Sequence, residues 1–155
     1  MRTFVFVAAG HRYALDASCV EAVHPLVRPR QVPGGPPWLA GVIDVHGELV
    51  PLVDATALLA GSGATERTMG ARVLLVDTGI GDGTRARFAL AVDRVEDAEE
   101  IDMSGAWRTG TGSSAWLGAV VQHRGEPAQC FEPRLLADAH PQLAAPGAIV
   151  RGGGA

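Results

Sequence analysis

Asp93, Glu96 and His123 are side chains whose types could together carry hydrolytic chemistry. Carboxylates and an imidazole can act as general base and general acid when they reach the same substrate. One hypothesis is therefore a small β-barrel enzyme of unknown substrate that uses these three residues. It requires the three side chains to converge on one pocket.

The sequence gives little reason to expect a metal or cofactor site. The histidines do not pair at the spacing of metal ligands, and the chain has no Cys-x-x-Cys motif. We therefore expect neither a metal nor a cofactor. The histidines are His11, His24, His46, His123 and His140.

Other reactive patterns are also incomplete. Gly79, Gly81 and Gly83 are not followed by the Lys-Ser/Thr pair of a phosphate-binding loop, so a hairpin loop is expected there. Ser113 and Ser114 lack the Gly-x-Ser-x-Gly context of a nucleophile. An acidic run is expected to be a solvated edge rather than a set of paired catalytic carboxylates. It consists of Asp97, Glu99, Glu100 and Asp102.

Composition limits the class of protein. The 155 residues fit one compact domain or two small lobes, and a net charge of −4 argues against nucleic-acid binding. The chain shows no signal peptide and no apolar run long enough to span a membrane, so a soluble cytoplasmic protein is expected. Cys19 and Cys130 each lie in an apolar run and are expected in the core, not in a disulfide.

Residues 38–59 and 116–137 resemble two copies of one segment. Trp38, Gly47 and Glu48 of the first copy match Trp116, Gly125 and Glu126 at a constant offset of 78. Upstream, residues 13–15 and 20–21 match residues 88–90 and 95–96 at an offset of 75. Two aligned blocks in the same order indicate a duplicated module.

The elements that must position these residues are mainly strands. Short β-branched runs separated by turn signals predict an all-β fold of small barrels or a sandwich. Tight turns are expected at His46-Gly47 and Arg124-Gly125, and short helices at 55–60 and 133–139. A polar connector near 61–71 is expected to divide two lobes, and 141–155 is expected to be a flexible tail. The strands are expected at 3–8, 13–15, 20–23, 40–45, 48–54, 72–77, 88–92, 116–121 and 126–131.

The segment 41–54, GVIDVHGELVPLVD, resembles the CheW family of coupling proteins of bacterial chemosensory arrays. The family pattern is Gly, two variable residues, Asn, an apolar residue, Arg and Gly, followed by an apolar stretch with Pro and Asp. Residues 4–15, 20–23, 32–38 and 91–95 resemble further family segments in the right order. The resemblance covers about residues 3–137.

The resemblance implies a single domain over 1–140, made of two pseudo-repeated, intertwined SH3-like five-stranded barrels with short helical turns and a short C-terminal helix. It implies a non-catalytic adaptor that docks to the regulatory domain of a CheA-type histidine kinase and to the cytoplasmic tip of a chemoreceptor. Two alternatives remain: the small enzyme described above, and a degenerate coupling protein that binds only one partner.

Departures from the family pattern lie at the first turn. Asp44 replaces the family Asn, His46 replaces the family Arg, and Ala22 stands where many members carry Glu. Histidine is smaller than arginine and mostly neutral near pH 7. These changes suggest a partner other than a standard chemotaxis kinase, as in accessory proteins of the Wsp-type surface-sensing pathway. The residues expected to contact partners are Val20, Ala22, Val23, Asp44, His46, Gly47 and Arg124.

The three tryptophans are expected to lie in different environments. Trp38 and Trp116 open equivalent strands, and each is expected to fill its own barrel. Trp107 lies in an expected loop and is either an ordinary loop residue or a contact anchor.

Overall fold

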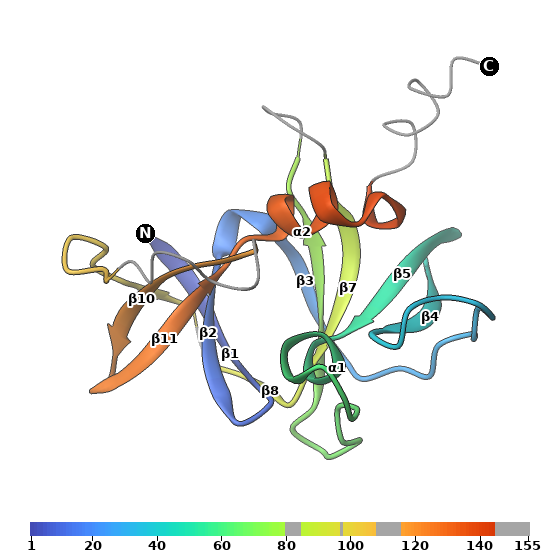
Figure 1. Cartoon of the computed structure of the whole chain (residues 1–155), viewed down its shortest axis with the longest axis horizontal. Coiled ribbons are helices and arrows are strands. Elements are labelled where there is room, and N and C mark those ends of the chain that lie inside the picture. Colours follow the sequence, from blue (N-terminus) through green and yellow to red (C-terminus); the bar gives the residue numbers. More distant parts are fainter. Residues whose placement is uncertain (80–84, 97, 108–115, 145–155) are drawn as a thin grey trace.

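The fold consists of two β-sheets and a few short helical segments (Figure 1). A computed structural model describes residues 1–79, 85–96, 98–107 and 116–144. The expected all-β class and the short helices at 55–60 and 133–139 are confirmed. None of the helices in these ranges is long and apolar enough to cross a membrane.

The first sheet joins both ends of the sequence. Its strand order is β10-β11-β2-β1-β8, and β9 also pairs with β1. The pairing of β2 with β11 is parallel and matches Ala14 with Cys130, whereas neighbouring pairs are antiparallel. The strands are β1 (Arg2–Ala8), β2 (His11–Asp16), β8 (Arg94–Val95), β9 (Glu99–Glu100), β10 (Leu117–His123) and β11 (Glu126–Phe131).

The second sheet is built from the middle of the sequence. Its order is β3-β6-β7-β5-β4, and β5 pairs in parallel with β7, matching Leu52 with Ala89. The two halves of Figure 1 correspond to these two sheets. The strands are β3 (Val20–Pro25), β4 (Leu39–Val45), β5 (Glu48–Asp54), β6 (Arg72–Asp77) and β7 (Arg87–Val92).

The two sheets repeat one strand order, as the internal repeat predicts. Replacing β4, β5, β7, β6 and β3 by β10, β11, β2, β1 and β8 converts one order into the other. The barrels close in the same way. Arg30 exchanges two backbone hydrogen bonds with Val42, and Trp107 exchanges two with Val120. Trp107 thus has a fixed backbone, although its side chain is 68% exposed.

Each barrel contains strands from both copies. The first copy supplies β1 and β2 to one sheet and β3, β4 and β5 to the other, and the second copy does the reverse. Residues 61–71 lie between α1 (Ala55–Ala60) and β6 and therefore separate the two copies in the sequence. They do not divide two lobes, because β5 and β6 belong to the same sheet. The chain passes between the sheets near Cys19–Val20 and near Asp93, and the polar composition of 61–71 reflects an exposed loop within one barrel.

Three apolar clusters fill the molecule. One lies within each barrel, around Val121 in the first and Leu75 in the second. The largest cluster joins the sheets and contains Phe6, Phe88 and Leu136. The two barrels therefore share one central core.

The C-terminal segment completes this core. The helix α2 (Pro133–Ala139) lies across the junction of the two sheets (Figure 1) and is followed by the 3-10 turn η2 (Pro141–Leu143). Leu143 is fully buried in the central cluster. The expected tail at 141–155 is corrected accordingly: residues 141–144 are packed, and 145–155 lie outside the described residues.

The paired tryptophans also belong to the junction. Trp38 and Trp116 both pack against the central cluster, not each inside its own barrel as expected. Their rings lie 4.8 Å and 5.6 Å from the ring of His140, measured between centroids. This arrangement ties the end of α2 to the hairpins of both copies.

Candidate partner-binding surface

His46 and Gly47 form the tip of the β4–β5 hairpin, which we call the first tip. Their φ angles are +51° and +85°, as a two-residue hairpin turn of the primed type requires. The Gly47 N–H donates a hydrogen bond of 2.8 Å to Asp44 Oδ1. The predicted turn and the positive φ of Gly47 are confirmed.

Asp44 and His46 have different roles at this tip. Both side chains are exposed. The Asp44 carboxylate already accepts the Gly47 N–H, so its first role is to hold the turn. An asparagine carbonyl could accept the same bond, which means that the change from the family residue alters the charge and keeps the turn. The His46 imidazole is the side chain that the tip presents to solvent.

Arg124 and Gly125 form the second tip, between β10 and β11. Their φ angles are +51° and +79°, and the strands leave the turn in the same register as at the first tip. The predicted equivalence of the two tips is confirmed. The Arg124 guanidinium pairs with Glu99, so part of its charge is compensated within the barrel.

The residues expected on β3 do not share one environment. Val20 packs against the central core, and Ala22 packs against the core of the second barrel. Val23 is 39% exposed and lies on an edge strand of its sheet. Of these three, Val23 is therefore the side chain best placed to touch a partner. We use "tip surface" for Val23, Asp44, His46 and Gly47.

Arg87 links the two parts of the tip surface. Its side chain contacts Glu21 of β3 through two N–O distances of 3.4 Å, and its Nη1 lies 2.5 Å from Glu48 Oε2 at the start of β5. Asp77 on β6 pairs with Arg87 across the two strands, and its Oδ2 lies 3.8 Å from Arg87 Nε. Arg85 pairs with both carboxylate oxygens of Asp77 and lowers the pKa of this group to about 2.

The first barrel contains the matching network. Arg12 contacts Glu96 at 3.1 and 3.2 Å and also pairs with Glu126. Arg12 and Arg87 are related by the offset of 75, as are Glu96 and Glu21, whereas Glu126 and Glu48 are related by 78. In each network, the arginine comes from one copy and both glutamates come from the other.

His123 belongs to the interior of this first-barrel network. Its Nδ1 lies 3.5 Å from Glu96, its Nε2 lies 3.1 Å from Glu99, and its side chain is only 2% exposed. The imidazole is thus enclosed between two carboxylates. This is an internal position, which offers no open path to a substrate.

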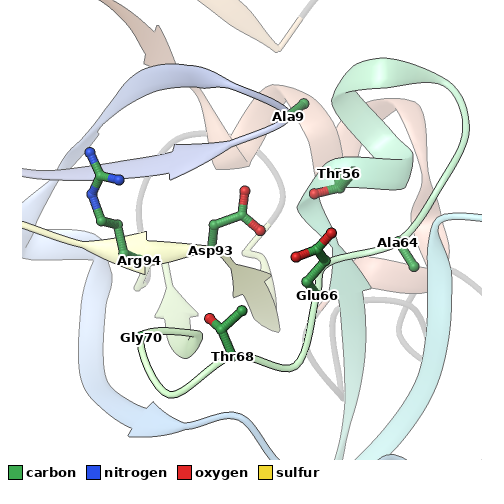
Figure 2. A pocket seen from close by; sticks show the side chains of 8 residues that line it. All are labelled: Ala9, Thr56, Ala64, Glu66, Thr68, Gly70, Asp93 and Arg94. Carbon is green, nitrogen blue, oxygen red and sulfur yellow. The ribbon is translucent and has the colours of Figure 1, made fainter.

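The three residues of the enzyme hypothesis do not converge on one pocket. Asp93 lines a pocket of about 500 Å³ together with Glu66, Thr56 and Arg94, and neither Glu96 nor His123 lines it. Figure 2 shows the carboxyl groups of Asp93 and Glu66 in this pocket. Burial, and secondarily Glu66 and Asp54, raises the pKa of Asp93. The specific geometry that the enzyme hypothesis requires is absent.

Other expected features can be placed only in part. Within the described ranges, no group of three or more His, Cys, Asp or Glu residues could hold a metal ion. Cys130 is buried, Cys19 is half-buried, and both are free thiols whose pKa is raised by burial. Glu99, Glu100 and Asp102 lie at or near the edge of the first barrel. Gly81, Gly83, Asp97, Ser113 and Ser114 lie outside the described residues.

The two arginine networks were missed in the sequence, although a signal for them was present. The repeat already aligns the glutamates, Glu48 with Glu126 and Glu21 with Glu96, whereas the recurrence of Arg12 as Arg87 at the offset of 75 went unnoticed. A buried charge requires a partner, so two recurring arginines with recurring glutamates would have indicated paired networks.

Comparison with known protein families shows to which family the chain belongs. The model of the CheW-like domain family matches residues 2–140. The chain belongs to the CheW-like domain family. The matched range includes both tips, β3 and α2.

Two individual proteins are similar to this CheW-like chain. The chemotaxis protein CheW of Bacillus subtilis (strain 168) is 32% identical over 53 residues, and the match spans 34% of each chain. The crystal structure of the scaffolding protein TtCheW from Thermoanaerobacter tengcongensis has a TM-score of 0.75 at 20% identity. That similarity covers 92% of this chain and 95% of the other, and it shows that the two proteins share the fold of paired SH3-like barrels.

Proposed function

We propose that this protein is a non-catalytic scaffold that couples a chemoreceptor to a CheA-type histidine kinase on the cytoplasmic side of the membrane. The observation that carries the proposal is the match of the CheW-like domain family to residues 2–140. The similarity to proteins named for chemotaxis and scaffolding points in the same direction. Such a scaffold acts by raising the effective concentration of its partners and by linking their states.

The tip surface is the proposed contact for the kinase regulatory domain. It combines an apolar side chain on an edge strand, Val23, with an exposed imidazole at a rigid turn, His46. Strand edges and small apolar patches are common features of surfaces that bind other β-domains. Because His46 stands at the arginine position of the family pattern, the proposed kinase is one whose surface does not require a fixed positive charge there.

A direct test is calorimetric titration of the protein with the regulatory domain of the CheA-type kinase from the same organism and, separately, with a soluble receptor-tip fragment. The proposal predicts saturable binding to both. Binding to the kinase alone would support the degenerate coupling protein instead. Failure to bind either partner would contradict the proposal.

A paired substitution tests the specificity of the tip surface. His46→Arg combined with Asp44→Asn restores the family residues and keeps an acceptor for the Gly47 N–H. Loss of matched contacts should weaken binding to the cognate kinase by about five- to 150-fold, which corresponds to 1–3 kcal/mol. Arg124→His makes the corresponding change at the second tip, outside the tip surface, and an equal loss of affinity there would show that Arg124 also contacts the partner. If the double variant changes the affinity by less than about threefold, the first tip is not part of the interface.

A further inference from the structure

The charged network around Arg87 crosses the end of the second sheet where the first tip emerges. β3 and β5 are separated by β6 and β7 in the strand order, so Val23 and the first tip share no direct strand pairing. Arg87 spans this separation because its guanidinium reaches Glu21 on β3 and Glu48 on β5. Glu48 directly follows Gly47, and Glu21 stands two positions before Val23.

We infer that Arg87 is a positioning residue for the tip surface: it sets the spacing between the β3 edge and the first tip. The inference rests on the proposed function, because that function makes the tip surface a partner contact. Arg87 is not itself a contact residue, since its side chain is only 14% exposed. It acts through Glu21 and Glu48, which are 39% and 46% exposed at the side chain.

Charge explains why this position requires arginine. Arg87 faces three carboxylates, those of Glu21, Glu48 and Asp77, and Arg85 forms a two-point pair with Asp77. Without Arg87, Glu21 and Glu48 would lose the cation between them and would repel each other. A guanidinium also carries several donors on one planar group, so a single side chain can hydrogen-bond Glu21 and form an ion pair with Glu48 at the same time. Removal of this group would release the first tip from β3 while leaving the turn itself intact.

The Arg12 network supplies an internal control. Arg12 joins Glu96 and Glu126 in the same manner, but at the second tip and in the other barrel. It is similarly shielded, with a side chain 19% exposed. Arg12→Gln should therefore remove a comparable inter-copy ion network without disturbing the tip surface.

The experiment compares Arg87→Gln, Arg87→Lys and Arg12→Gln in the full chain. The measurements are the thermal midpoint and the calorimetric affinity for the kinase regulatory domain. Both glutamine variants should lower the midpoint by similar amounts, but only Arg87→Gln should weaken kinase binding, by about fivefold or more. Arg87→Lys retains the positive charge but loses the planar fork, so its affinity should lie between those of wild type and Arg87→Gln. Glu48→Gln at the exposed end of the network provides a milder variant if Arg87→Gln does not fold.

A double-mutant cycle separates positioning from a general loss of stability. If Arg87 acts through the first tip, adding His46→Ala to Arg87→Gln should weaken binding no further than the more damaging single change does. Three results would overturn the inference and leave the proposed function standing. They are equal losses of affinity in Arg12→Gln and Arg87→Gln, additive effects in the cycle, and unchanged binding by both Arg87→Gln and Glu48→Gln. Failure of the wild-type protein to bind the kinase would overturn the proposed function, and the inference with it.

Discussion

Two residues at the first tip, Asp44 and His46, depart from the family pattern in chemistry, whereas the geometry of the turn matches that of the second tip. Asp44 introduces a negative charge where the family pattern has a neutral amide, yet its carboxylate holds the Gly47 N–H at 2.8 Å. His46 replaces a larger cation and adopts the φ of +51° that its counterpart Arg124 also adopts. The turn is therefore retained while the chemistry that it presents is changed.

Glycine at the two tips provides a test of this geometry. Gly47→Ala and Gly125→Ala should each lower the free energy of unfolding by about 1 kcal/mol, because both residues have positive φ. The space around each position is open, so the cost is conformational and not steric. Urea denaturation measures this change in the free energy of unfolding.

Two other glycines calibrate that result. Gly105→Ala should be nearly neutral, because the position is open and its φ lies outside the left-handed range. Gly41→Ala should be the most damaging change, because the new Cβ would lie 2.2 Å from the Arg30 carbonyl oxygen. Equal stability of all four variants would contradict the turn assignment.

Asp77 makes stability dependent on acid pH. Its pKa falls from 3.8 to about 2 in the folded protein, chiefly because it is hydrogen-bonded to Arg85. A lowered pKa stabilises the fold above pH 3.8, and this contribution is lost as the pH falls from 3.8 towards 2. Asp77→Asn should therefore cost about 1–2 kcal/mol at pH 7 and much less near pH 2. Urea denaturation at several pH values should give free energies of unfolding for wild type and Asp77→Asn that converge as the pH falls towards 2. A difference that does not change with pH would show that the carboxylate charge contributes nothing.

At the scale of elements, the sequence predicted most strands and both short helices. Local signals were sufficient for these: β-branched runs, the His46-Gly47 and Arg124-Gly125 turns, and Pro133 at the start of α2. The packing of residues 141–144 could not be predicted, because Leu143 is the one large apolar residue of a short run, Pro-Gln-Leu-Ala, that has no helical or strand periodicity. Its burial depends on a core assembled from distant strands.

Leu143 tests whether this C-terminal segment belongs to the fold. Leu143→Ala should lower the free energy of unfolding by about 2–4 kcal/mol, because it would leave a cavity in the central core. Leu135→Ala on α2 is the control, since that side chain is 44% exposed and its loss should cost far less. Similar stabilities of the two variants would mean that the 3-10 turn is not docked in solution.

At the scale of the whole molecule, the exchange of strands between copies is the feature that local patterns could not reveal. The offsets of 75 and 78 disclosed the duplication, but they are equally compatible with two separate barrels or with two intertwined ones. The parallel pairings of β2 with β11 and of β5 with β7 decide between them. As a result, the two barrels share one central core.

The proposed coupling of a receptor to a kinase can be tested by reconstitution. The autophosphorylation rate of the CheA-type kinase would be measured with membranes that contain the chemoreceptor, with and without this protein and with and without receptor ligand. The rate should respond to the ligand only when the protein is present, and His46→Arg with Asp44→Asn should reduce the response. A ligand response of equal size without the protein, or no response with it, would contradict the proposed coupling role.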